Sequence, residues 1–362
     1  MTEESTQKKL EEMRGFYYKL SKTMKSEKIK ILIVGFGLIG QERFKSITNL
    51  KKKGRNIELI GVFDPFFKDQ DKFIKEHKIN FVDNLKSGFE LNPDWVFVAT
   101  PHDDAVKITK IALKKDFNVL VEKPLGRNYK EAMEVFKCVE RKDQLWVGFN
   151  YRFFEGINQA LRDLQKGKFG NLISINILMG HGGKPEDKQT WKLDPIKAGG
   201  GCLIDPGIHL LDICSLIFNH QIEIQSGLQW KGFWKTGIEE ETHFLFKSKN
   251  AIINFQVSVV KWRSTFRMEI NGDKGYGIIN GRNRSYGEQK YITGERWGWQ
   301  KGGKQDESEK IVCIAANEDS FEKEIDALLF AKKAKNEIKP CSGKEAVALM
   351  KLLDDCREML KK

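Results

Sequence analysis

The sequence predicts an α/β protein in which a doubly wound parallel sheet is followed by an α+β region built on a mainly antiparallel sheet. Up to about residue 150, short and nearly continuous apolar runs alternate with helical patterns, which is typical of strands buried on both faces. Beyond that point the strand-like runs are rich in β-branched and aromatic residues and are separated by turn signals. The length of 362 residues favours two domains over one.

The first domain is expected to span residues 29–150, after an N-terminal extension at 1–28. The apolar runs expected to form its strands are 31–34, 59–63, 95–99, 119–121 and 145–149. The clearest helical patterns between them lie at 105–115 and 129–141. The extension carries apolar residues at helical spacing within a charged segment, so it is either an extra amphipathic helix or a frayed tail.

The second domain is expected to span residues 151–362, with helices on one face of its sheet and the final helices packing back toward the first domain. In chain order its expected elements are a helix at 156–166, a strand at 172–178, a helix around 206–218, strands at 223–230, 243–247, 251–260 and 266–270, and helices near 321–335 and 344–361. The last helix opens with a capping box that begins at Ser342. Residues 281–309, which include Trp297 and Trp299, form either a hairpin or a long loop.

The composition indicates a protein that binds neither nucleic acid nor a membrane. Lys and Arg number 62 against 50 Asp and Glu, a net charge of +12, but the lysines are scattered along the chain rather than gathered in a block. No apolar run approaches the roughly 18–20 residues that span a bilayer, and the N-terminus has no apolar signal-peptide block. The six cysteines show no metal-ligand spacing, so we expect reduced thiols, no metal and a cytoplasmic location.

A glycine motif directly follows the first predicted strand. It matches the pattern G-x-G-x-x-G, whose glycines permit a tight turn, the close approach of a pyrophosphate, and close packing of the next helix. We therefore predict that this loop binds a dinucleotide; its residues are Gly35, Phe36, Gly37, Leu38, Ile39 and Gly40. The alternative is an ordinary strand-to-helix turn.

An acidic residue stands where the second predicted strand ends. Asp64 lies 24 residues beyond Gly40, about where a carboxylate binds the adenine ribose diol. A carboxylate accepts a hydrogen bond from the 2′-hydroxyl but repels a 2′-phosphate. No arginine directly follows it, and the nearest cations that could bind such a phosphate are Lys68 and Arg43. NAD is therefore favoured over NADP as the cofactor.

Two further groups of residues carry the expected catalytic chemistry. Lys123 ends a predicted central strand, beyond which ligands of open parallel sheets bind, and it is either a substrate-facing cation or an ordinary solvated lysine. Asp205 and His209 stand four residues apart at the start of a predicted helix, where a carboxylate can orient an imidazole. In the alternative interpretation, Asp205 precedes Pro206 only as the cap of that helix.

Together these motifs resemble the Gfo/Idh/MocA family (glucose-fructose oxidoreductase, inositol dehydrogenase, rhizopine catabolism) of NAD(P)-dependent oxidoreductases. The matching segments are GFGLIG at 35–40, VATPHDDAV at 98–106, VEKPLGRNYKEAM at 121–133, VGFNYRF at 147–153 and GGGCLIDPGIHLLD at 199–212. DSFEKEIDALLFA and SGKEAVALMKLL near the C-terminus are also typical of it. The resemblance implies a Rossmann domain and then an α/β domain whose large, mainly antiparallel sheet commonly mediates dimers or tetramers. A homodimer or homotetramer is therefore expected.

The resemblance also implies roles for individual residues. Lys123 matches a lysine that contacts the nicotinamide ribose and the substrate hydroxyl, and His209 matches the usual general acid/base. On this ground the residues expected at the cofactor are Thr100, Pro101, His102, Glu122 and Lys123, and those expected at the substrate are Lys123, Tyr151, Arg152, Asp205 and His209.

A glycine-rich segment resembles a subgroup associated with sugar and nucleotide-sugar metabolism. It contains His181 and is followed by Trp191 and Lys192. In a binding role the tryptophan offers a ring face to a sugar, while the histidine and the lysine bind hydroxyls or phosphate. In a structural role the segment is a crossover with a packed tryptophan.

The function expected from these residues is reversible hydride transfer between nicotinamide and a secondary alcohol of a sugar, inositol or nucleotide sugar. Two other functions remain open. One is an enzyme that oxidises its substrate only transiently during an elimination or cleavage, and the other is a cofactor-binding regulator without catalysis. Retention of both Lys123 and His209 favours an enzyme.

Overall fold

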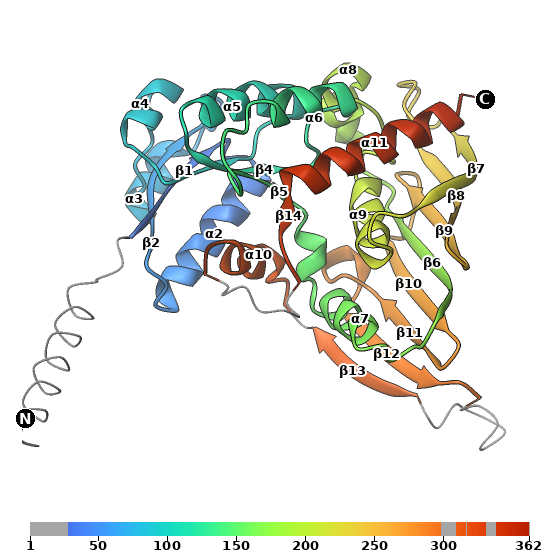
Figure 1. The fold of residues 1–362 in the computed structure, drawn as a ribbon. Helices are drawn as coiled ribbons and strands as arrows, with labels where there is room; N and C mark the ends of the chain where they lie inside the picture. The colour runs from blue at the N-terminus through green and yellow to red at the C-terminus, as the bar shows by residue number, and fades with distance from the viewer. Residues whose placement is uncertain (1–27, 298–308, 316, 331–337, 362) are drawn as a thin grey trace, which may run out of the picture.

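The computed structural model describes residues 28–297, 309–315, 317–330 and 338–361. Two sheets organise this part of the chain, one of six strands and one of eight (Figure 1). The helix considered for the N-terminal extension lies outside the described residues, as do Trp299 and residues 331–337. Among the described helices, none combines the length and the apolar character that a membrane crossing requires.

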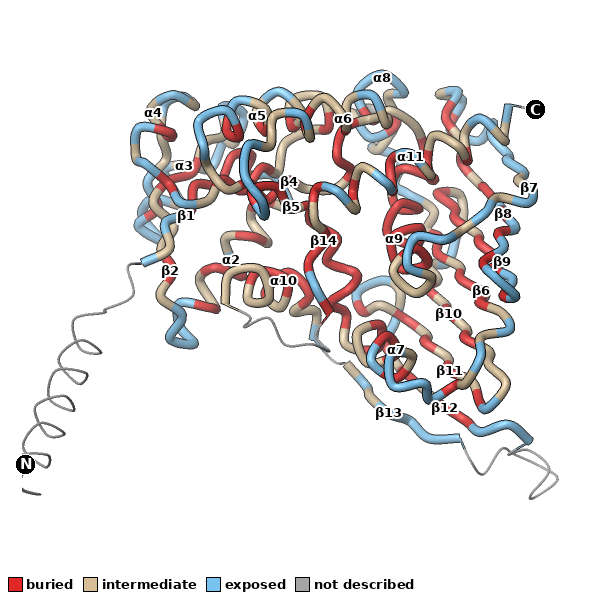
Figure 2. The backbone as a smooth tube through the Cα atoms, viewed as in Figure 1, coloured by how far each residue is buried: buried red, intermediate tan, exposed pale blue. Residues whose placement is uncertain are grey.

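The first sheet is parallel except at one edge, which confirms the predicted fold class. Its strand order is β14-β5-β4-β3-β1-β2. The five parallel strands are β1 (Ile29–Val34), β2 (Ile57–Phe63), β3 (Trp95–Val98), β4 (Asn118–Glu122) and β5 (Leu145–Gly148). Each overlaps one of the predicted apolar runs. Their central residues are buried on both faces of the sheet, which is why these strands are almost continuously apolar in sequence (Figure 2).

Helices connect these strands, and two of them were not predicted. They are α2 (Leu38–Lys52), α3 (Gln70–His77), α4 (Leu85–Glu90), α5 (His102–Lys114) and α6 (Tyr129–Phe136). The helices α3 and α4 have eight and six residues, too few to establish a helical period in the sequence. The predicted helix at 129–141 is too long, because α6 ends at Phe136 and the amides of Cys138 and Val139 bond the carbonyls three residues earlier.

The second sheet is antiparallel apart from the neighbouring pair β6 and β9. Its strand order is β13-β12-β11-β10-β6-β9-β8-β7. The strands are β6 (Leu172–Gly180), β7 (Glu223–Trp230), β8 (Glu241–Ser248), β9 (Ala251–Ser258), β10 (Thr265–Gly272), β11 (Gly275–Asn280), β12 (Gln289–Glu295) and β13 (Lys310–Ala315). Burial alternates along β8, because one face of the sheet packs on the core and the other faces outward. The described helices α7 (Glu155–Gln165) and α9 (Gly207–Ile217) lie on the core side (Figure 1).

The segment 281–309, for which a hairpin and a long loop were both considered, contains strand β12, and strand β13, which was not predicted, follows it. A short 3-10 turn, η4 (Arg284–Tyr286), precedes β12, which pairs antiparallel with β13. Strand β11 was not predicted, since glycines interrupt its apolar pattern. Gly277 is needed there, because an added Cβ would lie 3.0 Å from the ring of Phe169. The remaining short elements are the helix α8 (Pro195–Ala198) and the 3-10 helices η1 (Asn150–Phe153), η2 (Pro185–Gln189) and η3 (Trp191–Leu193).

The C-terminal segment returns to the parallel sheet. Its described elements are α10 (Ser320–Phe330), β14 (Cys341–Ser342) and α11 (Gly343–Met359). β14 pairs antiparallel with β5, while α10 packs on α2 and α11 packs on α6. The predicted capping box is confirmed, because the Ser342 hydroxyl accepts from the Glu345 amide and the Glu345 carboxylate accepts from the Ser342 amide.

Candidate functional site

A cavity of about 750 Å³ lies beyond the carboxyl ends of the parallel strands, where they meet β6 and α9. Loops after β1, β2 and β3 form one side, and residues of η1, β6, η3 and the turn after β11 form the other. The predicted site residues that line it are Gly35, Gly37, Leu38, Ile39, Asp64, Thr100, Pro101, His102, Glu122, Lys123, Tyr151, His181, Trp191, Lys192, Asp205 and His209. The tertiary structure therefore brings together residues that are spread over 175 positions of the sequence.

Glycine stands at the three motif positions for different structural reasons. Gly35 has φ of +93°, and an added Cβ would lie 2.6 Å from the Ala99 carbonyl. A Cβ on Gly40 would lie 2.1 Å from the carbonyl oxygen of Gly35. Gly37 has ordinary backbone angles, and no described atom lies within 4 Å of its added Cβ. Gly35 and Gly40 thus permit the turn itself, whereas Gly37 keeps open space beside the cavity.

The start of α2 is suited to an anionic group. Gly37 is the N-cap of α2, and no described side chain hydrogen-bonds to this cap. Backbone N–H groups at a helix N-terminus attract phosphate when no side chain satisfies them. A dinucleotide pyrophosphate therefore fits the loop, because the absence of a side chain at Gly37 lets the phosphates approach the loop backbone.

Replacing Gly37 with alanine is expected to leave the fold intact and to weaken dinucleotide binding by at least about tenfold, because the methyl group fills the space beside the loop. Gly40→Ala is the matched substitution in the same loop, and it should lower Tm because its Cβ meets the Gly35 carbonyl. Thermal unfolding and titration of tryptophan fluorescence with NADH measure the two effects. Unchanged NADH affinity in Gly37→Ala would contradict the predicted role of this glycine.

Asp64 connects the glycine loop to the end of β2. One oxygen of its carboxylate accepts from the Phe36 amide at 2.6 Å, and the other accepts from the amides of Phe66 and Phe67 at 2.8 and 3.1 Å. The carboxylate thus has a structural role in addition to lining the cavity. Phe66, which was not predicted, lines the cavity and is 85% exposed as a residue.

The prediction that Phe36 contacts the cofactor needs correction for its side chain. The ring is fully buried and packs edge-on against the rings of Phe44, Phe67, Phe73 and Phe81. An apolar residue inside the glycine motif faces the protein core, because the turn directs its side chain beneath the loop. Gly40 is likewise buried and is not among the residues that line the cavity.

Lys123 and Asp205 form the central ion pair of the cavity. The Lys123 ammonium, at the end of β4, donates to Asp205 Oδ1 at 2.5 Å. Burial alone would raise the pKa of the Asp205 carboxyl, but the positive charges of Lys123 and Lys192 hold that pKa below its usual value. Asp205 is not the N-cap of α9: Pro206 holds that position, and the described part of the chain provides no side-chain cap. The helix-capping alternative for Asp205 is therefore wrong.

His209 presents a neutral imidazole to the cavity. Its ring stacks on that of Tyr151, with centroids 3.8 Å apart and planes 9° from parallel. Its Nδ1 is buried and has no hydrogen-bond partner among the residues that the structure describes. Burial, and then the charge of Lys123, lower the pKa of His209 well below its ordinary value. A neutral imidazole keeps a nitrogen lone pair and can accept a proton.

The predicted loop residues and the glycine-rich segment meet at His102. Its Nδ1 lies 2.8 Å from the Ala198 carbonyl oxygen, and its ring contacts that of Trp191 edge-on with centroids 4.7 Å apart. Burial lowers the pKa of His102 to about 4, so it is neutral at pH 7. Trp191 therefore packs against a neighbour, as in the structural interpretation, and it also lines the cavity, so its contact with a sugar stays a prediction.

Arg152 is not in the cavity, contrary to the prediction. Its guanidinium is fully buried and pairs with both oxygens of Asp212, at 2.5 and 2.8 Å, and it also donates to the Lys339 carbonyl at 3.0 Å. A buried guanidinium requires such partners, so this arginine joins η1 to α9 and to the segment before β14. The sequence position beside Tyr151 could not reveal these partners.

Sequence reasoning also missed a buried network behind the site. The Glu122 carboxylate, which lines the cavity, pairs with Arg43 of α2 at 2.6 Å. Arg43 is 1% exposed and pairs in turn with Glu324 of α10, also at 2.6 Å. Helix α10 thus supports, through Arg43, the residue next to Lys123. Further cavity residues that were not predicted are Arg282, Arg284, Tyr286 and Glu318.

No other described group suggests metal or disulfide chemistry. All six cysteines are free. Within the described ranges, no three His, Cys, Asp or Glu residues are grouped so that they could hold a metal ion.

Comparison with protein-family models gives two matches. Residues 29–149 match the model described as an oxidoreductase family with an NAD-binding Rossmann fold, and residues 157–277 match the GFO/IDH/MocA C-terminal domain. The boundary between the two matches falls beside η1.

Curated relatives and solved structures agree with these models. Glucose-6-phosphate 3-dehydrogenase of Bacillus subtilis is 24% identical over 70% of this chain and 78% of its own length. A 2,7-anhydro-N-acetylneuraminate hydratase of Escherichia coli is 25% identical over 69% of this chain and 64% of its own. The aldose-aldose oxidoreductase from Caulobacter crescentus has a similar fold, with a TM-score of 0.76 and 17% identity over 92% of this chain and 98% of its own.

Proposed function

Since the chain belongs to the GFO/IDH/MocA family of oxidoreductases, we propose that it transfers a hydride reversibly between NAD and a secondary alcohol of a sugar-type substrate. The observation that carries this proposal is the convergence of Lys123, Asp205 and His209 on the cavity that also holds the glycine loop. A proton acceptor and a cation thus stand beside a loop suited to a dinucleotide.

The dinucleotide would be held by residues of the first side of the cavity. They are the backbone of the glycine loop, the Asp64 carboxylate, the loop at Thr100, Pro101 and His102, and the end of β4 at Glu122. When bound, nicotinamide supplies the acceptor or donor of the hydride.

Residues of both sides then act on the substrate hydroxyl. In the oxidation direction the O–H proton passes to the neutral His209 while the C–H bond on the same carbon breaks with its electron pair, so that a carbonyl forms. The Lys123 ammonium stabilises the charge that develops on the oxygen. Asp205 positions Lys123 through their ion pair, rather than His209 as the sequence spacing indicates. Reduction reverses these transfers.

The structure supports NAD over NADP as the cofactor of this proposal. Asp64 faces the cavity, and a carboxylate disfavours a 2′-phosphate. Arg43, one of the two cations considered for that phosphate, is buried and already paired with Glu122 and Glu324. Titrating the protein with NADH and with NADPH tests the preference, and tighter binding of NADPH would overturn it.

The experiment for the activity is a panel of sugars, inositols, sugar acids and nucleotide sugars. NADH formation at 340 nm is followed in one direction, and NADH consumption with the matching ketones in the other. Steady NADH accumulation supports the proposal. Substrate conversion without NADH accumulation would instead favour the transient-redox alternative, for which the relationship to a hydratase is the motivating observation. Absence of conversion throughout the panel counts against both.

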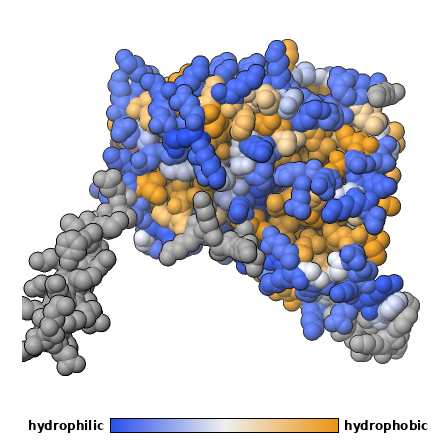
Figure 3. Space-filling view, viewed as in Figure 1, coloured by the Kyte–Doolittle hydropathy of each residue, from blue (hydrophilic) through white to orange (hydrophobic). Residues whose placement is uncertain are grey.

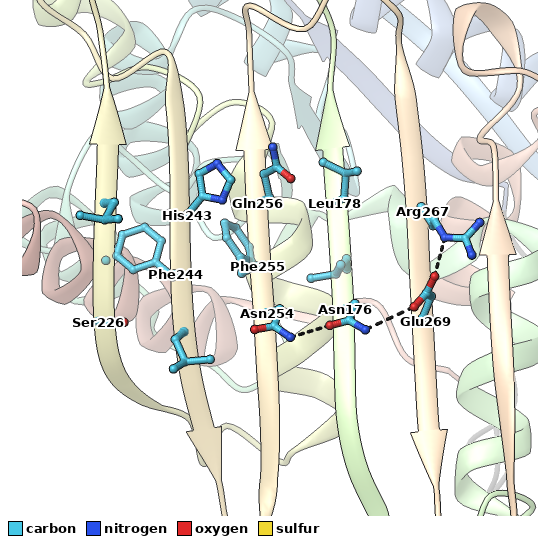
Figure 4. Close-up of a pocket in the computed structure, with 14 residues that line it drawn as sticks. Asn176, Leu178, Ser226, His243, Phe244, Asn254, Phe255, Gln256, Arg267 and Glu269 are labelled. Carbon is cyan, nitrogen blue, oxygen red and sulfur yellow. Dashed lines mark hydrogen bonds and ion pairs between the residues drawn. The ribbon is translucent and has the colours of Figure 1, made fainter.

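The outer face of the antiparallel sheet is proposed to join copies of this chain. Figure 4 shows this face, where Asn254 donates to Asn176 and Asn176 donates to Glu269 across neighbouring strands. Leu228 and Leu245 are exposed beside this polar ladder. The apolar residues that gather around α9 in Figure 3 lie on the helix-covered side of this sheet and are not part of its outer face.

Leu245→Glu is expected to dissociate the oligomer, because it places a charge on the surface that the partner would cover. Light scattering after size-exclusion chromatography should give two or four times the 41.7 kDa of one chain for the wild type and a smaller multiple for the variant. Ile111→Glu on α5 is the matched control, since Ile111 is similarly exposed but lies in the other layer. A monomeric wild type would contradict this proposal.

A further inference from the structure

Arg282 lines the substrate side of the cavity, and none of the proposed catalytic steps uses it. It follows β11 in a turn closed by three backbone bonds, from Gly281 to the Phe266 carbonyl, from Asn283 to the Gly287 carbonyl, and from Tyr286 to the Asn283 carbonyl. The turn therefore holds the residue on a defined backbone rather than on a long free loop.

Aromatic rings surround the Arg282 guanidinium. Its central carbon lies 4.2 Å from the ring centroid of Tyr286, 5.0 Å from that of Tyr151 and 5.5 Å from that of Phe154. Tyr151 in turn stacks on His209. The cation is thus fixed one ring away from the proposed general base, with its planar group packed among apolar faces.

The charge of Arg282 is not matched by an acid. Its Nε is buried with no hydrogen-bond partner, and it forms no ion pair with any residue in the described ranges. The neighbouring Glu318 is within 2.6 Å of Arg284 instead, and Arg284 also pairs with Glu42. Arg282 also hydrogen-bonds the side chain of Tyr286, so its partners include a neutral group but no paired acid. A guanidinium of this kind is suited to a multiply charged oxyanion.

Among the described residues that line the cavity, Lys192 is a further cation without an ion pair, and Asp64 is an acid without one. Lys123 pairs with Asp205, Glu122 pairs with Arg43, and Asp104 pairs with Lys107. Lys192 forms no ion pair with a described acid, although its charge acts on Asp205, and it lines the same cavity as Arg282. Burial lowers the pKa of His181 and the charge of Asp205 opposes this, while the charges of Lys192 and Arg282 lower the pKa further. Both cations therefore act on one cavity residue.

We propose that Arg282 and Lys192 form an anion subsite and that the substrate is a phosphorylated sugar, carrying either a phosphate monoester or a sugar-linked diphosphate. This inference rests on the proposed function for the identity of the reacting sugar. Arg282 supplies a fixed fork of donors, and Lys192, which is solvent-exposed, supplies a second positive charge. The phosphate of the substrate would thus neutralise the positive charges of Arg282 and Lys192.

The test measures binding by calorimetry with NADH-saturated protein and three probes: glucose, glucose 6-phosphate and UDP-glucose. At least one phosphorylated probe should bind at least about tenfold more tightly than glucose. Tighter binding of glucose 6-phosphate indicates a phosphate monoester, and tighter binding of UDP-glucose indicates a sugar-linked diphosphate. Raising the salt concentration should weaken binding of that probe much more than binding of glucose.

Variants then assign the effect to residues. Arg282→Gln should weaken binding of the phosphorylated probe by about 30-fold or more, since it removes the charge that is proposed to contact the phosphate. Glucose binding should change less than about threefold. Arg282→Lys should retain part of the affinity for this probe, and Lys192→Gln should lower that affinity about three- to tenfold. Lys197 is an exposed lysine outside the cavity, so Lys197→Gln should bind the probe as the wild type does. Thermal unfolding of each variant identifies any loss of fold.

The outcomes separate this inference from the proposed function. Equal binding of glucose and both phosphorylated probes, no binding of either phosphorylated probe, or full affinity in folded Arg282→Gln would overturn the anion subsite even if NADH forms with another substrate. Should Arg282→Gln fail to fold, Arg282→Lys and Lys192→Gln decide, and wild-type affinity in both overturns it. Phosphate-dependent binding without NADH formation from any substrate would uphold the subsite and defeat the dehydrogenase.

Discussion

Replacing Lys123 with methionine or alanine is expected to slow turnover by at least about a hundredfold while NAD binding persists. The ammonium group lies at the end of β4, where it can stabilise negative charge on the reacting oxygen, and a loss of this size is usual when such a group is removed. Methionine keeps the aliphatic stem, so it separates the lost charge from lost packing. Single-turnover rates and fluorescence titration with NADH measure the two quantities.

The ion pair complicates the Lys123 variants in one respect. Asp205 loses its partner at 2.5 Å, which removes a charge that holds its pKa down and so favours protonation of the carboxyl. The double variant Lys123→Met with Asp205→Asn removes that unpaired charge. If Lys123 acts on the substrate, the double variant stays as slow as the single one. Lys107→Ala on α5 serves as the control for loss of an exposed lysine. Turnover within tenfold of the wild type in folded Lys123→Met would reject the assignment.

Replacing His209 is expected to reduce turnover by about a hundred- to ten-thousandfold, the usual contribution of a general acid/base. His209→Phe keeps a ring that can stack on Tyr151 but cannot accept a proton, and His209→Asn keeps a polar group without the ring. Both variants should bind NADH normally, because His209 belongs to α9 rather than to the glycine loop. Similar turnover in His209→Phe and the wild type would exclude the histidine as the base.

The pH dependence provides a second measurement on the same residue. Burial and the charge of Lys123 lower the pKa of His209, so the imidazole stays neutral below the range in which an ordinary histidine takes up a proton. The acid limb of kcat/KM for oxidation should therefore fall below pH 6.5. Lys123→Met removes one lowering influence and should move this limb upward in whatever activity remains. A limb at or above pH 7 in the wild type would contradict a neutral, buried base.

Much of the fold could be predicted from local sequence. The buried parallel strands are apolar almost throughout, so their positions were found to within a few residues of the observed bounds. The helices α3 and α4 and the strand β11 were missed, because short elements and glycine interruptions leave no clear period. Within residues 281–309, the described strand β12 is fixed by its pairing with β11 and with β13, which lies beyond that segment.

The candidate site divides along the same line. The glycine loop, Asp64 and Lys123 could be predicted because their chemistry is linked to the ends of buried strands. Arg152 could not be told from a cavity residue, since its partner Asp212 lies 60 positions away. Arg282 had no local signal, because its role depends on the rings that pack around it and on the partner that Glu318 takes elsewhere.

By itself, therefore, the sequence determined where the long helices and the buried parallel strands form, where the backbone can admit a dinucleotide, and which family the chain resembles. Only the tertiary structure decided which charges are paired: Lys123 with Asp205, Arg152 with Asp212, and Arg43 with both Glu122 and Glu324. The physical reason is that backbone conformation follows from neighbouring residues, whereas the free energy of a buried charge depends on partners that packing brings from distant parts of the chain.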